Sequence, residues 1–332
     1  MSQKEKQKYK VPDRNNSYRT SIGGQALIEG VMMRGVDKAS MAVRLSSGEI
    51  DVETWSVQST KDRKWYQKVP IVRGVFNFVS SMVLGYKCLM KSAEKMELDD
   101  GEEEEKPGKF EQKILDLFGD NLMKVVTVVG MVIGVAVAVL LFMYLPALIA
   151  KGVNTLTVNF LSTELGWFRT LIEGIIKIAL FVGYLAIVAC MKDVRRTFEY
   201  HGAEHKSIAC YEGGEELTVE NVRQYSRFHP RCGTSFLIIV LIISIIVFSV
   251  VTWDNLFIRL ALKIVLLPVV VGIAYELIKI AGRHDNVFTR ILSAPGLALQ
   301  RLTTREPDDE EIETGIAALK AVLPDNKGDD QW

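Results

Sequence analysis

The residues best suited to chemistry in this chain are two histidines and a glutamate in His201-Gly202-Ala203-Glu204-His205. In a helix, His201 and His205 lie one turn apart on the same face, so both imidazoles can reach one ion. H-x-x-E-H is the inverzincin spacing, in which the two histidines bind zinc and the glutamate activates a water. The chain has only 4 histidines in 332 residues, so this spacing rarely arises by chance. The spacing predicts a zinc site with Glu204 as the catalytic base.

Two further candidate ligands lie just before an apolar segment. His229 and Cys232 are separated by two residues, a spacing found among zinc ligands. Together with His201 and His205 they would make a four-ligand set, which favours structural zinc, whereas three protein ligands and an open position favour catalysis. The alternatives are a His229 bonded to the backbone and a Cys232 packed as a small apolar residue.

Glu276 is a candidate for a distant metal ligand. It follows His205 by 71 residues, a separation compatible with the third, glutamate ligand of inverzincin sites. The alternative is an ion pair with Lys279 or Arg283 at the membrane interface.

Glu29 is a second acid with an unusual setting, because it lies among apolar residues and four glycines in 22–35. So many glycines predict positive φ angles or a close approach of the backbone. We consider Glu29 a reserve catalytic acid or ligand if this segment folds over the histidines. The alternative is an ion pair with Arg34 that braces a tight turn.

The composition indicates a membrane protein. The chain is 48% apolar, with a mean hydropathy of +0.16. Four apolar stretches are near the length of a helix that crosses a ~30 Å hydrocarbon core, namely 125–150, 171–191, 236–251 and 260–281. Lys+Arg and Asp+Glu are both 40, so the charge gives no indication of a nucleic-acid partner. We expect the lipid bilayer as a partner, other membrane proteins as further candidates, and no nucleic acid.

The distribution of basic residues predicts the orientation. Residues 192–234 contain seven Lys or Arg, whereas 151–168 contain only Lys151. The positive-inside rule therefore puts 192–234 and both termini in the cytoplasm, in a multi-pass protein of the bacterial inner (plasma) membrane. The first forty residues are polar and lack the apolar region of a signal peptide. In a reducing compartment the four cysteines are expected to be thiols or ligands.

The amino-terminal third is expected to be soluble or peripheral. Residues 1–18 are predicted to be a disordered tail and 19–68 a small cytoplasmic subdomain with a β-hairpin about Ser46-Ser47-Gly48. Apolar residues recur at helical spacing in 69–93, which predicts an amphipathic helix at the membrane interface or docked on the bundle, with a fifth span as the alternative. The glutamate-rich segment 94–112 is predicted to be an acidic linker.

The remainder is expected to form a four-helix membrane region at 113–291, interrupted by the cytoplasmic histidine-rich loop 192–234, and a cytoplasmic segment at 292–332. Within it, Arg169, Glu173 and Lys177 recur every four residues, which predicts neutralising pairs that snorkel at the outer end of the helix, with a transport pathway as the alternative. The predicted fold is mainly α: a polytopic membrane protein with about four transmembrane helices, one interfacial amphipathic helix and a small amino-terminal α+β subdomain with a β-hairpin.

A family resemblance adds to this prediction. In chain order the sequence contains GGQALIEGVMMRG, HGAEHKSIACYE, HPRCGTSF and PGLALQRLTTREP. These motifs resemble the YqhQ-like bacterial membrane proteins, whose members are labelled predicted metal-dependent enzymes without an established reaction. The resemblance covers residues 20 to 307. The resemblance implies a metal site at His201, Glu204 and His205. The chain differs from soluble inverzincin peptidases, since it lacks their large paired domains.

Two functions from different classes follow. The first is a membrane-embedded hydrolase in which His201 and His205 bind zinc, His229 or Glu276 is the third ligand, and Glu204 takes a proton from water that attacks an amide or ester at the cytoplasmic face. The second is a non-enzymatic factor that assists membrane-protein assembly or binds a partner, with a structural metal or none. A transporter is a third possibility, against which the mostly uncharged spans argue.

Overall fold

A computed structural model describes residues 9–12, 18–58, 64–100, 122–161, 168–249, 256–284, 286–326 and 328–331. The described chain is mainly helical, with a four-stranded sheet near the amino terminus and three helices long and apolar enough to cross a membrane. This confirms the predicted fold class. The chain divides into two compact units. The first comprises Met1–Asp99, Tyr184–Ser244 and Leu266–Trp332, and the second comprises Asp100–Gly183 and Ile245–Val265.

The sheet of the first unit is an antiparallel meander of β1 (Gly23–Leu27), β2 (Gly30–Arg34), β3 (Lys38–Arg44) and β4 (Ile50–Ser56). The β3–β4 pair, in which Met41 lies opposite Glu53, confirms the predicted hairpin. The β1–β2 hairpin was not predicted, because its turn is Ile28-Glu29 rather than a typical Asn-Gly. Glu29 takes the positive φ, of 48°, that the sequence suggested for the glycines.

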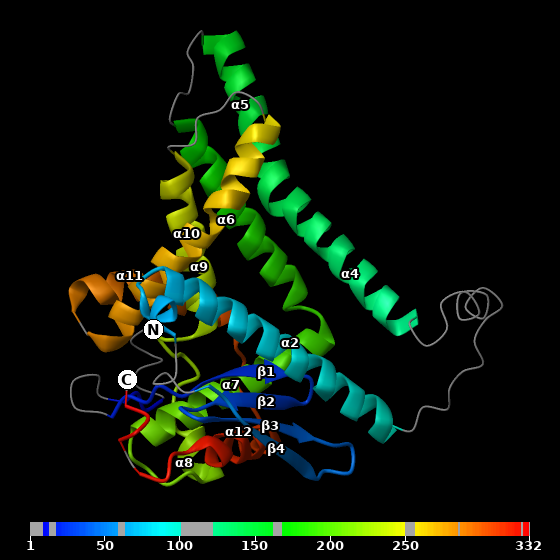
Figure 1. Cartoon of the computed structure of the whole chain (residues 1–332), viewed down its shortest axis with the longest axis vertical. Helices are drawn as coiled ribbons and strands as arrows, with labels where there is room; N and C mark the ends of the chain where they lie inside the picture. The colour runs from blue at the N-terminus through cyan, green and yellow to red at the C-terminus, as the bar shows by residue number, and fades with distance from the viewer. Residues whose placement is uncertain are drawn as a thin grey trace, which may run out of the picture. The chain divides into compact units, whose positions relative to one another are not determined.

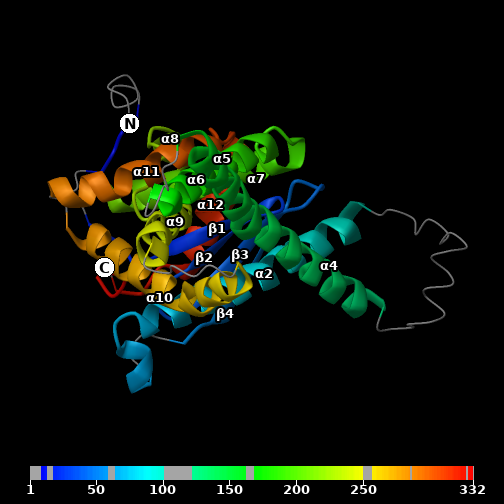
Figure 2. The same cartoon turned by 90° about the horizontal axis from the view of Figure 1, so that it is seen from above.

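Both faces of the sheet are covered. On one face, strand residues share a core with α7 (Lys192–Glu212) and α12 (Asp309–Val322); this core includes Val31, Met33, Tyr200, Ile208 and Leu319. On the other face, residues such as Leu27 and Met41 pack against Cys88 of α2 (Val72–Asp100). The strands lie below α2 in Figure 1, and the view from above shows them between α2 and α7 (Figure 2). The helix with the H-x-x-E-H motif is therefore held by a buried sheet face.

Helices α8 (Val219–Arg223) and α11 (Val287–Thr303) also belong to the first unit. Helices α11 and α12 both begin with capping boxes, formed by Asn286 with Thr289 and by Asp308 with Glu311. A capping box satisfies two backbone N–H groups of the first turn, so each start is fixed by its local sequence.

The predicted segment boundaries meet the structure only in part. Helix α2 begins at Val72, within the predicted amphipathic helix at 69–93, and continues to Asp100, so that 94–100 of the predicted linker are helical. The rest of the predicted linker, 101–112, lies outside the described residues, as do 1–8 and 13–17 of the predicted tail. Within that tail, Lys10 forms a parallel bridge with Tyr225.

The first predicted span is part of a longer helix. Helix α4 (Leu122–Val139) runs through a π-helical turn, Leu140–Tyr144, into α5 (Leu145–Leu161), and the apolar part is Val128–Asn159. We expected this span at 125–150, which contains Pro146. The preceding π turn shifts the hydrogen-bond pattern, so that the missing N–H of proline does not end the helix.

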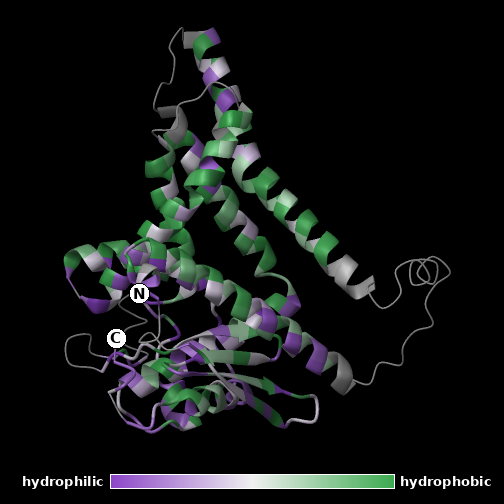
Figure 3. Cartoon of the chain, viewed as in Figure 1, coloured by the Kyte–Doolittle hydropathy of each residue, from purple (hydrophilic) through white to green (hydrophobic). Residues whose placement is uncertain are grey.

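The other apolar helices agree better with the prediction. They are α6 (Phe168–Val188), α9 (Gly233–Ser249) and α10 (Leu256–Arg283). The candidate spans within them are Leu171–Val188 and Leu260–Arg283, while α9 is apolar but shorter, at 17 residues. Hydrophobic residues dominate these helices, whereas α7, α8 and α12 carry many polar residues (Figure 3).

The charged residues of α6 do not snorkel as predicted. Glu173 and Lys177 are both buried within the second unit, and Glu173 forms an ion pair with the buried Lys263 of α10. Both ammonium groups lie over the ring of Phe248, at 5.5 Å for Lys177 and 5.7 Å for Lys263. A charge in a membrane-crossing helix is costly without a partner, which favours these inward contacts. The side chain of Arg169 lies outside the described residues.

Candidate metal centre

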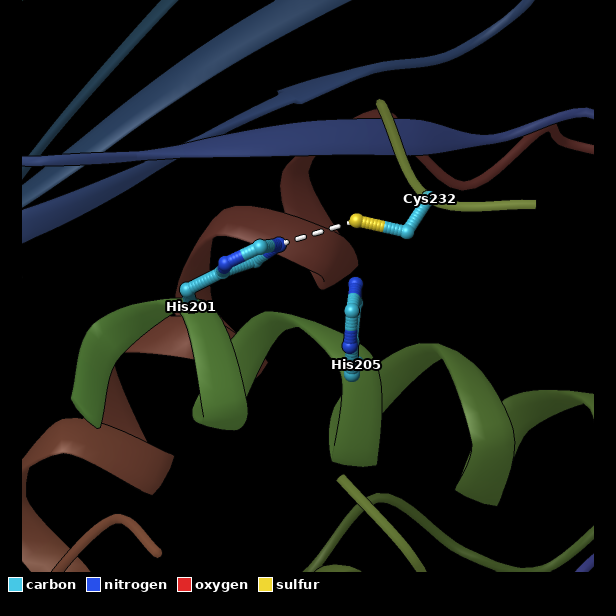
Figure 4. A group of neighbouring side chains, drawn as sticks. All are labelled: His201, His205 and Cys232. Carbon is cyan, nitrogen blue, oxygen red and sulfur yellow. Dashed lines mark hydrogen bonds between the residues drawn. The ribbon is translucent and has the colours of Figure 1, made fainter. Parts of the chain in front are cut away.

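Three side chains of the first unit bring ligand atoms together: His201 and His205 from α7, and Cys232 from the segment before α9 (Figure 4). One ligand atom of each lies within 4.8 Å of the others, and Nε2 of His201 is 3.2 Å from Sγ of Cys232. Around tetrahedral zinc, with bonds of about 2.0–2.3 Å, neighbouring ligand atoms are roughly 3.5 Å apart. The two ligand atoms that lie farthest apart would have to move about 1 Å closer to reach such a geometry. The cluster could therefore hold a metal ion.

Backbone carbonyls fix the orientation of both imidazoles. Nδ1 of His201 lies 2.7 Å from the carbonyl oxygen of Thr303, and Nδ1 of His205 lies 2.6 Å from that of Arg227. A carbonyl oxygen only accepts hydrogen bonds, so each Nδ1 must carry the proton and donate it. This arrangement leaves Nε2 of both rings for a metal, as is usual for metal-binding histidines.

Nε2 of His205 is the observation that tests whether a metal fits. It is buried and has no hydrogen-bond partner among the described residues. A buried polar atom without a partner costs roughly 1–3 kcal/mol, and such atoms are rare in native structures. A metal ion bound by two imidazoles and a thiolate would supply the missing partner, and this donor set suits zinc.

The electrostatics of the cluster favour the thiolate form of Cys232. Burial raises the pKa of this thiol, but the neighbouring His201 and His205 outweigh burial and hold it well below its usual value. The backbone N–H of Thr234 also donates to Sγ at 3.4 Å. Burial lowers the pKa of His201, yet Cys232 and Glu204 raise it to about 9. All four cysteines, each within the described residues, are outside disulfide bonds.

Glu204 lies beside the three ligand atoms but outside their group. Its Oε2 is 4.0 Å from Nε2 of His201, while Oε1 accepts a hydrogen bond from the N–H of Gly24 at 3.0 Å. Burial raises the pKa of this carboxyl, although both histidines lower it. A Cβ at Gly24 would lie 2.5 Å from the carbonyl oxygen of Met32 and 3.0 Å from the carboxyl carbon of Glu204, so only glycine fits there.

His229 is not part of the three-residue group. Its ring centroid is 5.6 Å from that of His205, and its Nε2 lies 3.6 Å from a carboxylate oxygen of Glu212. Gln300 binds its backbone at both ends, accepting from the N–H at 2.9 Å and donating to the carbonyl at 2.7 Å. Burial lowers the pKa of His229, with Arg231 acting in the same direction. The structure therefore differs from the backbone-bonded alternative considered above, because the ring faces Glu212 and the side chain of Gln300 binds the backbone of His229.

Glu276 lies apart from the cluster as well. Both of its carboxylate oxygens accept hydrogen bonds from the guanidinium of Arg73, a residue of α2. The structure therefore gives Glu276 an ion-pair role with a different partner from Lys279 or Arg283.

Glu29 is engaged at the β1–β2 turn. Its carboxylate forms an ion pair with Arg196 of α7 and accepts a hydrogen bond from the hydroxyl of Tyr200 at 3.1 Å. The proposed pair with Arg34 does not brace this turn, because Arg34 lies at the far end of β2, opposite Gly23. Glu29 is not in the three-residue group.

Some residues that shape the site carried no chemical signal in the sequence. Thr303 and Arg227 contribute only backbone oxygens, which any residue would supply. Gly202, inside the motif, lets α7 pack closely on the segment after α11, since a Cβ there would collide with the carbonyl oxygen of Arg305. This glycine could have been noticed, because the motif is otherwise a good helix.

Comparison with known proteins gives two matches. The family described as Protein of unknown function (DUF1385) matches residues 69–325. The Uncharacterized protein YqhQ of Bacillus subtilis (strain 168) is 33% identical over 323 residues, which cover 95% of this chain and 94% of that protein. No solved structure is found to match.

Proposed function

The chain belongs to the DUF1385 family, and from this premise we propose that it is a membrane-embedded, metal-dependent hydrolase with zinc bound by His201, His205 and Cys232. The family description assigns no activity, so the proposal depends on the site. One observation carries it: both histidines donate Nδ1–H to backbone carbonyls, which leaves Nε2 of His205 buried beside a cysteine sulfur and without a hydrogen-bond partner among the described residues.

The proposed roles follow from the number of ligands and their positions. Three protein ligands leave one coordination position, where zinc lowers the pKa of a water to about 7 and polarises a carbonyl. Glu204 lies on the same face of α7 as both histidines, and the N–H of Gly24 holds one of its oxygens. We assign Glu204 the role of general base, with its Oε2, 4.0 Å from Nε2 of His201, as the atom that takes the proton.

We place this site at the cytoplasmic face of the plasma membrane, with both termini in the cytoplasm. The basic residues of 192–234 support this orientation through the positive-inside rule. The three apolar helices long enough to cross a membrane support the membrane location. The proposed substrate is an amide or ester presented at that face.

Burial of the cluster favours a second candidate function, a non-enzymatic factor with a structural metal. The exposed fractions are 1% for His205, 5% for Glu204 and 7% for Cys232. If a small shift brought Glu204 onto the ion, the shell would close, and the metal would tie α7 to the segment before α9. Such a protein would assist membrane-protein assembly or bind a partner.

Cobalt substitution separates the two candidates. Full-length protein in detergent is loaded with Co²⁺, and its absorption is recorded before and after addition of acetohydroxamate. For the hydrolase, we expect a thiolate-to-cobalt band that shifts with hydroxamate, because one position is open. Glu204→Gln should keep both the metal and the shift. No shift in the wild type, together with metal loss in Glu204→Gln, would identify a closed structural site and refute the hydrolase.

A further inference from the structure

A cavity of about 410 Å³ lies away from the metal cluster, between α2, the end of β4 and the short 3-10 turn Trp65–Lys68. Its lining includes two cations, Arg34 and Lys87, two aromatic rings, Trp55 and Phe76, and polar groups such as Ser80. None of the described residues that line it is acidic. A cavity of this composition favours an anionic ligand that also has an apolar part.

The pairing of α2 with β4 explains why Lys87 has no acidic partner among the described residues. Four residues of a helix and two of a strand advance by similar lengths, about 6 and 6.6 Å, so every fourth residue of α2 can face every second residue of β4. Lys95 pairs with Asp51 and Lys91 with Glu53. The next pair in this series is Lys87 with Trp55, and both residues line the cavity. Among the described residues, no acid neutralises the Lys87 ammonium.

Helix α2 lies beside a membrane-crossing helix at its amino-terminal end. Asn77 donates to the hydroxyl of Tyr275 at 2.6 Å, and a Cβ on Gly74 would lie 2.7 Å from the Cβ of Tyr275. Phe78 packs on Phe236 of α9, with ring centroids 5.4 Å apart. Tyr275 belongs to the second half of the candidate span Leu260–Arg283, while later turns of α2 pack on the sheet. The cavity therefore lies where the membrane helices meet the soluble sheet.

An exposed apolar stripe leads along α2 into the same cavity. Its residues are between 39% and 52% exposed and recur every three or four positions, on one helical face; they are Val72, Phe76, Val79, Val83, Tyr86 and Met90. Phe76 and Val83 also line the cavity. A long apolar stripe exposed to water is unfavourable, whereas acyl chains at a membrane interface would cover it.

We propose that this cavity binds the phosphate of an anionic phospholipid from the surrounding bilayer, with the acyl chains lying along the stripe of α2. Arg34 and Lys87 bind the phosphate oxygens, and Ser80 is placed to donate a hydrogen bond to the headgroup. The apolar stripe is the reason to choose a lipid rather than free phosphate. This inference is independent of the metal site and of the proposed hydrolase.

Native mass spectrometry of the full-length protein in detergent, titrated with phosphatidylglycerol, phosphatidylcholine or inorganic phosphate, tests the proposal. Lys91→Gln is the matched control for Lys87→Gln, because both lysines lie on α2 one turn apart, but Lys91 is paired with Glu53. We expect the wild type to bind phosphatidylglycerol more tightly than phosphatidylcholine. The double variant Lys87→Gln, Arg34→Gln should bind phosphatidylglycerol about tenfold more weakly, equivalent to about 1.4 kcal/mol.

Three results would overturn the proposal: equal binding of the two lipids, equal losses in Lys87→Gln and Lys91→Gln, or phosphate binding as tight as that of the anionic lipid. Thermal unfolding and metal content of each variant show whether it is folded. If the double variant fails to fold, the single Lys87→Gln variant decides, because this lysine is exposed.

Discussion

Replacing Gly202 by alanine tests how the site is held together. Gly202 faces the carbonyl oxygen of Arg305, and an added Cβ would lie well inside van der Waals contact with it. The carbonyl would have to retreat by about 1 Å or more. Two residues earlier in the same segment, the oxygen of Thr303 accepts the hydrogen bond from Nδ1 of His201 at 2.7 Å. The same retreat would stretch that bond beyond the range of a hydrogen bond.

The expected magnitude differs between stability and metal binding. Overpacking costs about 1–3 kcal/mol, but Gly→Ala in a helix recovers about 1 kcal/mol, so the net loss of stability is small. Loss of a hydrogen-bond partner behind a metal-binding histidine typically weakens metal binding by about 10–100-fold. Metal affinity is therefore the quantity that separates this effect from general destabilisation.

Competition with a chromophoric zinc chelator would measure the affinity, with thermal unfolding recorded in parallel. Gly152→Ala is the matched control, because Gly152 lies in helix α5 with nothing within 4 Å of an added Cβ. We expect Gly152→Ala to bind zinc like the wild type. Wild-type affinity in Gly202→Ala would refute the reasoning, since it would show that the close contact does not position His201.

Three further predictions concern other buried groups. Burial raises the pKa of Glu311 from 4.5 to about 7, so its contribution to stability is present below pH 4.5 and lost as the pH rises through 7. Between pH 5 and 8, the free energy of unfolding measured with denaturant should fall by up to about 3 kcal/mol less in Glu311→Gln than in the wild type. The same pH dependence in both proteins would contradict this. Lys263→Met should cost about 3 kcal/mol in unfolding assays by leaving Glu173 buried without this partner, and adding Glu173→Gln should restore most of it; no restoration would contradict the pairing. With zinc bound, a thiol-alkylating reagent should modify only the exposed Cys190, and removal of zinc by a chelator should make Cys232 reactive as well. Early reaction of Cys232 in the zinc form would contradict its role as a ligand.

Local sequence spacing predicted the part of the site that lies on one helix. His201 and His205 converge because four residues make about one helical turn, and this follows from sequence alone. His229 and Cys232 could not be separated in the same way, because both lie in the segment before α9. Only the tertiary contacts of His229 with Glu212 and Gln300 turn its ring away from the group.

The partners of the two other acids depend on long-range folding. Glu276 binds Arg73, which is 203 residues away, and Glu29 binds Arg196, which is 167 residues away. Sequence reasoning offered nearby basic residues instead, because charge pairing by spacing applies only within one helix or turn. Both pairs join segments that only the tertiary fold brings together, α2 with α10 and α7 with the β1–β2 turn.

Backbone features set a similar limit on the predicted fold. The β3–β4 hairpin has Ser46-Ser47-Gly48 at its turn, with Gly48 at a φ of 86°, and this local signal predicted it correctly. The β1–β2 turn has Glu29 at positive φ, which few sequence rules anticipate. The buried charges of α6 were misjudged because their partner, Lys263, comes from another helix.

Metal content of the purified full-length protein tests the central claim most directly. Inductively coupled plasma mass spectrometry should find about one zinc per chain in the wild type. The same content should persist in His284→Ala, a change at an exposed histidine, and be lost in His205→Ala and Cys232→Ser. A wild type that contains no stoichiometric metal and takes up none on reconstitution, or variants of His205 and Cys232 that keep it, would contradict the account.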